Sequence, residues 1–337
     1  MDPFRIKKVS EQVSGSALID DPIDLFYLTG LPLSKGRLLI KPEGATLFVD
    51  GRYYELARKE APCTVALWDE QKKLRETRIE FDSAATPYEE YLSLKHQFPD
   101  TEWIPTPQLV KKVRMIKDSK EIQSLKKAAG VTWRGYRRVV ECLKEGVSEE
   151  ELAFEFEVFC RKNGASRLSF EPIIAFGENS AYPHHRAGKS RLRNHQVVLI
   201  DVGAVVDHYH GDLTRIVYFG KPDPQVARLE EIVRRAQKKA VESVRPGLLV
   251  SALNQIVNGE FEKEDVKQLY MHSLGHGIGL ETHELPQMKS GKEDLPLKVG
   301  MVFTIEPGLY QPGVGGIRIE DMVRVTETGY ENLYDEL

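Results

Sequence analysis

The chain has 337 residues, of which 41% are apolar and 29% charged, and its formal net charge is −4. This length predicts about two domains, and the small net charge gives no reason to expect nucleic acid or a membrane surface as a partner. No stretch approaches the roughly 20 apolar residues of a transmembrane helix, and the N-terminus lacks an apolar signal core, so we expect a cytoplasmic protein.

The first part of the chain alternates strand patterns with helical ones. Residues 16–19, 38–40 and 46–49 have the composition of strands, and residues 52–59 and 87–96 that of helices. This alternation predicts a small α/β domain over residues 1–112. The basic stretch 111–120 leads directly into a helical pattern. We therefore interpret it as solvated chain, with residues 113–120 as a linker, rather than as a nucleic-acid patch.

The remainder, residues 121–337, begins with helices and then becomes rich in strands. Residues 120–143 carry apolar side chains at helical spacing, and Ser148 with Glu151 predicts a capping box for a second helix that Gly164 closes. Helices are also predicted at 227–244 and 249–261. Strands are predicted at 173–176, 196–202, 213–219, 301–306, 316–320 and 322–325. The order of helices followed by strands occurs twice, which suggests a structural duplication, although no repeated motif is evident.

Two aspartates accompany apolar strand patterns in the middle of the chain. Asp201 lies inside the run VVLIDVG, and Asp212 directly precedes the predicted strand 213–219. Burying a carboxylate among β-branched residues is costly unless it is paired or bound to a cation. A hairpin centred between Val206 and Asp207 would place Asp201 opposite Asp212, and facing carboxylates repel each other unless a cation neutralises them. An aspartate that only caps a turn is the alternative.

A second predicted hairpin carries two further carboxylates around a turn region rich in glycine and proline. Glu306 ends one strand, and Glu320 lies two residues after Arg318 in the next. Strand alternation places Arg318 and Glu320 on one face. The alternative is that Arg318 and Glu320 form an ion pair on the surface. The apolar residues that flank them disfavour this alternative, because they indicate an interior strand.

Eight of the nine histidines lie between His184 and His283. Three of them, His272, His276 and His283, lie in one glycine-rich segment of twelve residues. Glycine allows the backbone there to approach its neighbours closely. A set of carboxylates with one imidazole is rich in oxygen and suits Mn²⁺, Fe²⁺ or Co²⁺ better than a thiolate zinc site does. Bridging carboxylates could hold two such ions roughly 3.5–4 Å apart, which predicts hydrolysis of an amide or ester.

With the motifs VLIDVGA, GDLTR, HSLGHGIGLE, TIEPGLY and GIRIED, the chain resembles the creatinase/aminopeptidase P/prolidase family, the pita-bread metallopeptidases. The resemblance implies an α/β (α+β) fold, in which a small creatinase-like domain precedes a pita-bread catalytic domain. The N-terminal motifs DLFYLTG and TLFVDGRY support the first domain and argue against methionine aminopeptidase. The family's metal ligands fall on Asp201, Asp212, His276, Glu306 and Glu320.

The resemblance also implies an activity, cofactors and an assembly. The expected enzyme is an Xaa-Pro aminopeptidase or Xaa-Pro dipeptidase that acts on proline-containing peptides through a metal-bridging hydroxide. Two divalent ions are expected, with Mn²⁺ preferred over Co²⁺, Fe²⁺ or Zn²⁺, and a homodimer is expected. The metal-free creatinase reaction and a catalytically inactive, protein-binding pita-bread domain are the alternatives, but both are associated with lost ligands.

Beyond the ligands, the resemblance assigns roles to several side chains. Glu306 would shuttle a proton, and Thr214 would buttress the metals. His184 would contact the substrate, with its neighbour His185 as the weaker candidate. Active-site or supporting positions fall on His272, His283, Tyr310 and Arg318. Two features depart from the family pattern: His208 and His210 are expected in a solvent-exposed turn or beside the metals, and Met322 stands where many members carry an acid.

Overall fold

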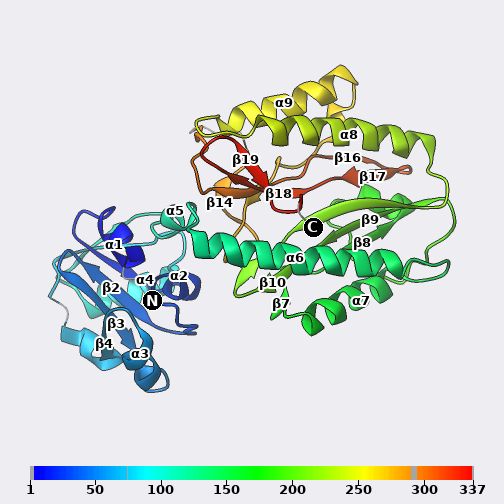
Figure 1. Ribbon diagram of the computed structural model, residues 1–337. Coiled ribbons are helices and arrows are strands. Elements are labelled where there is room, and N and C mark those ends of the chain that lie inside the picture. Colours follow the sequence, from blue (N-terminus) through cyan, green and yellow to red (C-terminus); the bar gives the residue numbers. More distant parts are fainter. Residues whose placement is uncertain (1–3, 74, 290–293, 336–337) are drawn as a thin grey trace. The chain divides into compact units, whose positions relative to one another are not determined.

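The computed structural model describes residues 4–73, 75–289 and 294–335 (Figure 1). Residues 1–3, which belong to the N-terminus without a predicted signal core, lie outside the described part. The chain divides into two compact units, residues 1–114 and 115–337. In the described part of the chain, no helix is both long and apolar enough to cross a membrane.

The N-terminal unit is built on one mixed six-stranded sheet. Its central strands β2 and β1 are antiparallel, whereas β5 and β6 continue from β1 in parallel. The strand order is β4 (Thr64–Leu67), β3 (Gly44–Val49), β2 (Arg37–Lys41), β1 (Ser16–Ile19), β5 (Arg78–Phe81) and β6 (Glu102–Pro105). The helices are α1 (Phe4–Ser10), α2 (Pro22–Thr29), α3 (Tyr54–Glu60), α4 (Tyr88–Gln97) and α5 (Lys111–Arg114).

This unit has its own core and its own buried ion pair. Arg114 at the end of α5 donates to Asp24 in α2 at 2.7 Å, and both side chains are almost completely buried. A buried pair of this kind is strongly destabilising to break, because the remaining charge is left without a partner. The end of the unit is thereby tied to its first helices.

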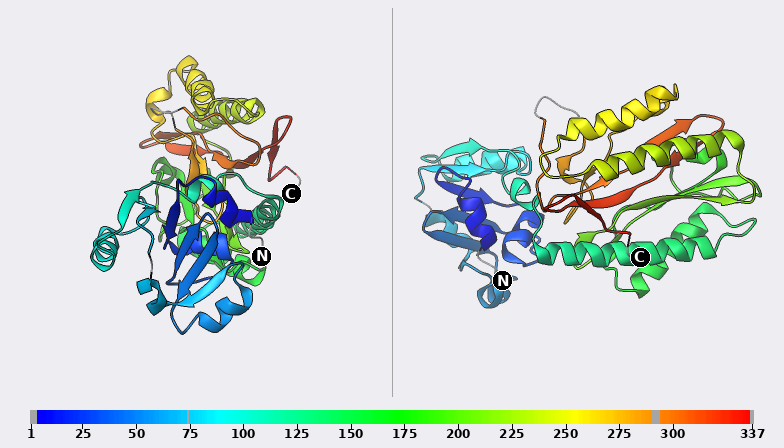
Figure 2. Two further views of the ribbon diagram at one scale, coloured as in Figure 1. Left: turned by 90° about the vertical axis from the view of Figure 1, so that its left-hand side faces the viewer. Right: turned by 45° about the horizontal axis from the view of Figure 1, so that its top comes forward.

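The C-terminal unit contains two pairs of helices with strands between them. Figure 1 and the right-hand view of Figure 2 show α6 (Ser119–Glu141) and α7 (Glu149–Lys162) along one side of the strands, and α8 (Pro224–Ser243) and α9 (Val250–Lys263) along the other. One apolar core joins α6 and α7 to β8, β9 and β10, and a second joins α8 and α9 to the later strands. The apolar face predicted for the helix over residues 120–143 is thus buried against strands.

The helix ends follow from local hydrogen bonding. The capping box predicted for α7 is confirmed, because the Ser148 side chain accepts from the Glu151 N–H and the Glu151 side chain accepts in return. Gly164 lies just beyond the helix with φ of +99°. Helix α6 begins with an equivalent box between Asp118 and Glu121.

The strands of this unit are grouped into several antiparallel sheets. Strand β9 (Gln196–Val202) lies between β8 (Ile173–Phe176) and β12 (Leu213–Phe219), and these three strands have the bounds predicted from the sequence. A small sheet contains β7 (Arg167–Leu168), β10 (Ala204–Val206) and β11 (Tyr209–His210). The largest runs β14 (Glu284–Gln287), β13 (His276–Gly277), β15 (Val302–Ile305), β18 (Asp321–Val325) and β19 (Tyr330–Asn332), and β16 (Gly308–Gln311) pairs with β17 (Gly315–Arg318).

The predicted register of the first hairpin was wrong by two residues. Asp201 pairs with Thr214 rather than with Asp212. The reason is the turn, which is centred between Asp207 and His208, both with positive φ, one residue later than expected. Because residues two apart on a strand share a face, the shift leaves Asp212 on the same side as Thr214 and Asp201.

Candidate metal centre

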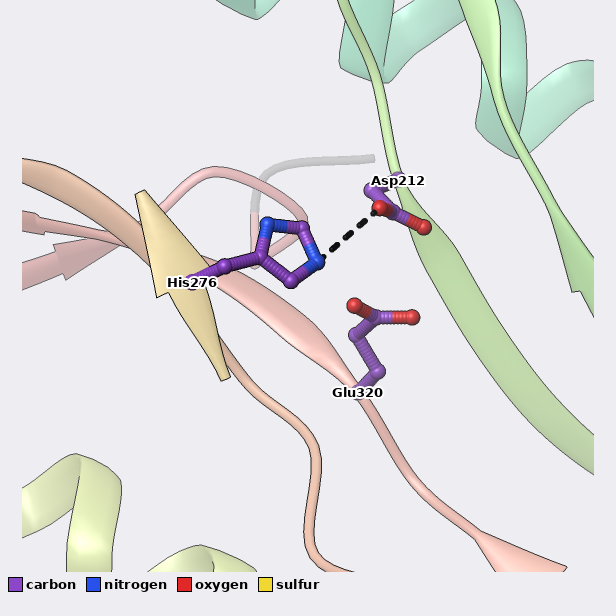
Figure 3. Close-up of side chains that lie close together, drawn as sticks. All are labelled: Asp212, His276 and Glu320. Carbon is purple, nitrogen blue, oxygen red and sulfur yellow. Dashed lines mark ion pairs between the residues drawn. The ribbon is translucent and has the colours of Figure 1, made fainter. Parts of the chain in front are cut away.

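Three of the predicted ligands come together where strands from distant parts of the sequence meet. One donor atom from each of Asp212, His276 and Glu320 lies within 4.8 Å of the others. Figure 3 shows the His276 ring pointing toward the two carboxylates from the opposite side of the site. Its Nε2 atom is 3.7 Å from Asp212 Oδ2 and 3.4 Å from Glu306 Oε1. Glu306 therefore belongs to the same cluster.

The fifth predicted ligand, Asp201, is buried beside this cluster and only half satisfied. Its Oδ2 atom is ion-paired with Arg318, whereas its Oδ1 atom is buried and has no hydrogen-bond partner among the residues described. A buried carboxylate oxygen without a donor is costly unless a cation approaches it. The geometry of Asp201 thus fits a metal on its Oδ1 side.

A hydroxyl and a guanidinium hold the carboxylates in place. Thr214 donates to Glu320 Oε2 at 2.7 Å and accepts from Arg318 Nε at 3.3 Å. Arg318 also donates to the Tyr310 hydroxyl at 2.6 Å. Thr214 and Glu320 are joined further by an isolated β-bridge between their backbones. The hydroxyl of Thr214 therefore orients a predicted ligand.

The charges in the site favour a bound cation. Burial raises the pKa of Asp212 and of Glu320 well above the usual carboxyl range, and repulsion from the neighbouring carboxylates Asp201 and Glu306 raises both pKa values further. Burial likewise raises the pKa of Glu306 to about 8. Four carboxylates with one imidazole are the hard donor set preferred by divalent first-row cations. The residues present therefore fit the two divalent ions that the sequence predicts.

The tautomer of His276 also favours a bound cation. Its Nδ1 atom lies 3.2 Å from the Gly277 carbonyl oxygen, which can only accept a hydrogen bond. The proton of the neutral ring is therefore on Nδ1, and the Nε2 lone pair faces the carboxylates. Burial lowers the pKa of His276 to about 3, so the ring is neutral at physiological pH. A lone pair directed at carboxylate oxygens calls for a proton or a metal between them.

Two further predicted histidines lie around the cluster. The His283 ring packs edge-on against His276, with 4.1 Å between ring centroids. The Nε2 atom of His272 is 2.9 Å from the Tyr310 hydroxyl. Burial and the positive charge of Arg318 lower the pKa of His272 to about 4. The neutral His272 ring is therefore a hydrogen-bond partner of the buried Tyr310, whereas the His283 side chain is exposed.

The five predicted ligands, together with His272, His283 and Arg318, line one open cavity of about 430 Å³, which is within the size range of small-ligand sites. His184 lies on the wall of the cavity and is exposed. The wall also contains residues that the sequence motifs did not indicate, including Phe170, Glu171 and Arg186. The residues that line the cavity are Phe170, Glu171, Ile173, Pro183, His184, His185, Arg186, Asp201, Asp212, His272, Ser273, His276, Thr282, His283, Glu306, Arg318 and Glu320. Residues 170–173 and 183–186 lie mostly outside regular strands, so no periodicity could have indicated them.

The glycine-rich segment around His276 lets two backbones lie in close contact. A Cβ atom on Gly275 would be 2.1 Å from the Thr304 carbonyl oxygen, and one on Gly277 would be 2.2 Å from that of Leu285. Only glycine fits at these positions. The Thr304 hydroxyl, which the sequence did not indicate, accepts from the His276 N–H at 3.1 Å and donates to Glu306 Oε1 at 3.2 Å.

The two departures from the family pattern have structural explanations. His208 lies in the exposed turn, as expected, but the expectation of a solvent-exposed turn is wrong for His210, which is 2% exposed. Its Nδ1 atom is 3.1 Å from the Gly279 carbonyl oxygen, which gives a polar ring a partner in the interior. Met322 is buried, with its sulfur 3.5 Å from the Tyr334 hydroxyl.

Carboxylates and an imidazole that converge on a cavity of this size are the arrangement of a metal-dependent hydrolase. Residues 123–327 match metallopeptidase family M24, and residues 6–116 match the creatinase/prolidase N-terminal domain. The chain therefore belongs to metallopeptidase family M24 and is a metallopeptidase. The predicted α/β fold, with a creatinase-like domain before a pita-bread domain, is confirmed.

Individual relatives match nearly the whole chain. The Xaa-Pro dipeptidase of Pyrococcus horikoshii is 35% identical over 98% of this chain and 96% of its own. The structure of an Xaa-Pro dipeptidase from Bacillus anthracis has a TM-score of 0.93 at 32% identity, and covers 98% of this chain and 96% of that one. An X-Pro aminopeptidase from Thermotoga maritima has a TM-score of 0.89 at 30% identity, over 97% of both chains.

Proposed function

We propose that the protein is a two-metal exopeptidase that hydrolyses the peptide bond preceding proline, with Xaa-Pro dipeptides as its preferred substrates. The proposal that the activity depends on metal is supported by the set of five largely buried donors. The strongest evidence is the Oδ1 atom of Asp201, which has no hydrogen-bond partner among the described residues, and the His276 Nε2 lone pair, which faces the carboxylates. The proline specificity is proposed from the named activities of the relatives.

In this proposal, each ligand has a place in the observed cluster. Asp212 and Glu320, whose donor atoms lie within 4.8 Å of each other, would be shared by the two ions, and Asp201 would bind one of them. His276 and Glu306, whose donor atoms are 3.4 Å apart, would hold the other. When bound, the ions would polarise the scissile carbonyl and lower the pKa of an attacking water. Mn²⁺ is the expected species, because the donor set is mostly oxygen.

The remaining residues would position the substrate and move protons. Glu306 has an oxygen in the cluster and would accept the proton of the attacking water. His184 and His283 are exposed on the cavity wall and would donate hydrogen bonds to the substrate carbonyl as negative charge develops on it. Arg318 is bound to Asp201 and to Tyr310, so its role is to fix the ligand rather than to contact the substrate.

The cavity also offers apolar contacts of the kind that a proline ring needs. Phe170, Ile173 and Pro183 line it together with the charged groups. Proline lacks an amide N–H and has a fixed φ, so a site for it must accept a tertiary amide in one conformation. These three side chains are the proposed contacts of the pyrrolidine ring.

An Xaa-Pro aminopeptidase is the second candidate, favoured by the similarity to the enzyme from Thermotoga maritima. The test is hydrolysis of an Xaa-Pro dipeptide and an Xaa-Pro-Yaa tripeptide by metal-stripped protein, with and without added Mn²⁺. Cleavage of the dipeptide alone would support the dipeptidase, and release of the first residue from the tripeptide would support the aminopeptidase. If Mn²⁺ stimulates neither reaction, the proposal is wrong, and the protein-binding alternative gains support.

A further inference from the structure

Part of the cavity wall is formed by an irregular segment whose position needs an explanation. Residues 176–188 begin with Phe176, the last residue of β8, and then contain only a short 3₁₀ turn, Gly177–Ala181, before residues 183–186 reach the cavity. A segment with so little regular structure does not fix the direction of its side chains by backbone hydrogen bonding alone. Something outside it must place His184.

One buried carboxylate holds this segment from the α7 side. Glu149, the first residue of α7, is 0% exposed. Its Oε1 atom accepts from the Phe176 N–H at 2.9 Å and from the Asn179 side chain at 2.8 Å. Its Oε2 atom is 2.8 Å from His185 Nε2 and accepts from the Gly188 N–H at 3.1 Å. A carboxylate has about four acceptor positions, and all four are filled by donors from this one segment.

The position of Glu149 at a helix N-terminus makes its burial favourable. The first backbone N–H groups of a helix carry partial positive charge, which stabilises a carboxylate there. The N–H groups of Glu149 and Glu150 also donate to the carbonyls of Ser190 and Gly188, at 3.2 and 3.0 Å. The end of the segment is therefore bound to the helix through both backbone and side chain.

The same segment is held from the other side by the strand that carries Arg318. Gly316 donates to Ser180 Oγ at 2.7 Å, and a Cβ atom on Gly316 would be 2.1 Å from the Ser180 carbonyl oxygen. Arg318 donates to the Pro183 carbonyl at 3.4 Å. The segment is thus clamped between α7 and β17, and His184 is the residue that extends from the clamp into the cavity.

We propose that Glu149 and His185 form a positioning pair that fixes His184 in the cavity. His185 is held by Glu149, and its neighbour His184 is therefore the histidine presented to the substrate. Neither member of the pair is a catalytic residue, because both act through the position of His184. This inference rests on the proposed function only in assigning the substrate contact to His184.

The test compares E149Q, H185A and H185Q with H184A in the Mn²⁺-loaded, full-length enzyme, using kcat and KM for an Xaa-Pro dipeptide. Glutamine at position 149 loses the charge and turns an NH₂ group toward one pair of donors, so we expect kcat to fall by about 10–100-fold with unchanged metal content. H185A should also lower kcat. H185Q retains a donor that can reach Glu149, and should restore most of the loss.

A double-mutant cycle separates positioning from general destabilisation. If Glu149 acts through His184, E149Q should have little further effect on kcat in the H184A background. Fully additive losses would overturn the proposal. The matched control is E260Q, which removes the charge of another buried carboxylate without touching the cavity. Glu260 lies on α9 and is bound to Arg235 and Lys239 of α8 and to Lys263 of α9. E260Q should lower stability but leave kcat unchanged.

Hydrogen exchange provides a readout that does not depend on activity. E149Q should accelerate amide exchange within residues 176–188 and leave β9 and β12 protected. If exchange in the segment is unchanged, Glu149 is not its anchor and the proposal fails, whatever the substrate of the enzyme proves to be. If exchange accelerates but the wild-type enzyme cleaves no Xaa-Pro peptide, the anchor stands and the proposed function fails.

Discussion

The two walls of the cavity are built in opposite ways. The acidic wall, formed by Asp201, Asp212, Glu306 and Glu320, lies at the ends of paired strands, and each of these side chains is at least four-fifths buried. The histidine wall, formed by His184 and His283, lies on irregular segments, and both side chains are exposed. Strand pairing fixes the first wall, whereas a few side-chain hydrogen bonds fix the second. We infer that the first wall holds ions and that the second contacts the substrate.

The largest expected effect comes from removing a carboxylate of the acidic wall. D212N keeps the shape but not the charge of a proposed bridging ligand. We expect loss of at least one ion and a decrease in kcat/KM of about a thousandfold or more, or ~4 kcal/mol. Metal content by mass spectrometry and steady-state kinetics would measure both. The matched control is E171Q, a carboxylate on the rim of the same cavity, which should retain both ions. Full metal content in D212N would contradict the assignment.

Substitution on the histidine wall should leave the ions in place. H184A removes a donor proposed to act only as charge develops on the substrate, so kcat should fall by about 100-fold, with KM changed much less. Metal content and melting temperature should match the wild type. A loss of metal in H184A would show that the two walls are not independent and would break the comparison.

Removing the metals should expose the repulsion within the acidic wall. With ligand well above its dissociation constant, bound metal should raise the melting temperature by ~5–10 °C. Glu306 has a folded pKa of about 8 against an ordinary 4.5, so the folded state holds a proton that the unfolded state has lost. The unfolding free energy of the metal-free protein should therefore fall as the pH rises from the ordinary pKa of 4.5 to the folded pKa of about 8.

The pH range chosen for that measurement matters. The lowered pKa of His276 has the opposite effect below pH 6.5, where protonation favours the unfolded state. The decline should be clearest between pH 6.5 and 8, and thermal denaturation of the chelated protein would measure it. E306Q should reduce this slope and Mn²⁺ should abolish it. A metal-free protein with equal stability at both pH values would contradict the prediction.

The smallest expected effect distinguishes two histidines of one hairpin. His210 is buried with a carbonyl partner, so H210A should cost about 1–3 kcal/mol of unfolding free energy. H208A, in the exposed turn, should change it by less than about 0.5 kcal/mol. Denaturant titration of both variants would measure the difference. Equal effects would mean that burial does not distinguish the two positions.

The sequence was most informative where regular patterns exist. Strands β8, β9 and β12 have their predicted bounds because each is an apolar run with a clear end. Strands β4 and β6 were missed because they are four-residue edge strands with partly exposed side chains. The hairpin register was misjudged because Asp207 and His208 can both adopt positive φ, so composition alone did not locate the turn.

In the site, too, only residues that belong to a local sequence pattern could be predicted. The five proposed ligands could be selected from motifs, and the structure brings their side chains to one cavity. Glu149 was not selected, because three consecutive glutamates after Ser148 have the same appearance in a capping sequence. Only the fold shows that one of them is buried against residues 176–188. Contacts between segments far apart in the chain leave no local pattern.

The glycines beside His276 have a consequence for how this protein tolerates change. At Gly275, Gly277 and Gly279 a single added carbon would meet other atoms within 2.4 Å, two of these contacts being with backbone. In a saturation library, the two positions that meet backbone, Gly275 and Gly277, should therefore reject every other amino acid at the level of folding. Substitutions of His276, which lies between them, should give proteins that fold but do not hydrolyse substrate. Selection for expression and selection for activity would then read out different residues of the same short segment.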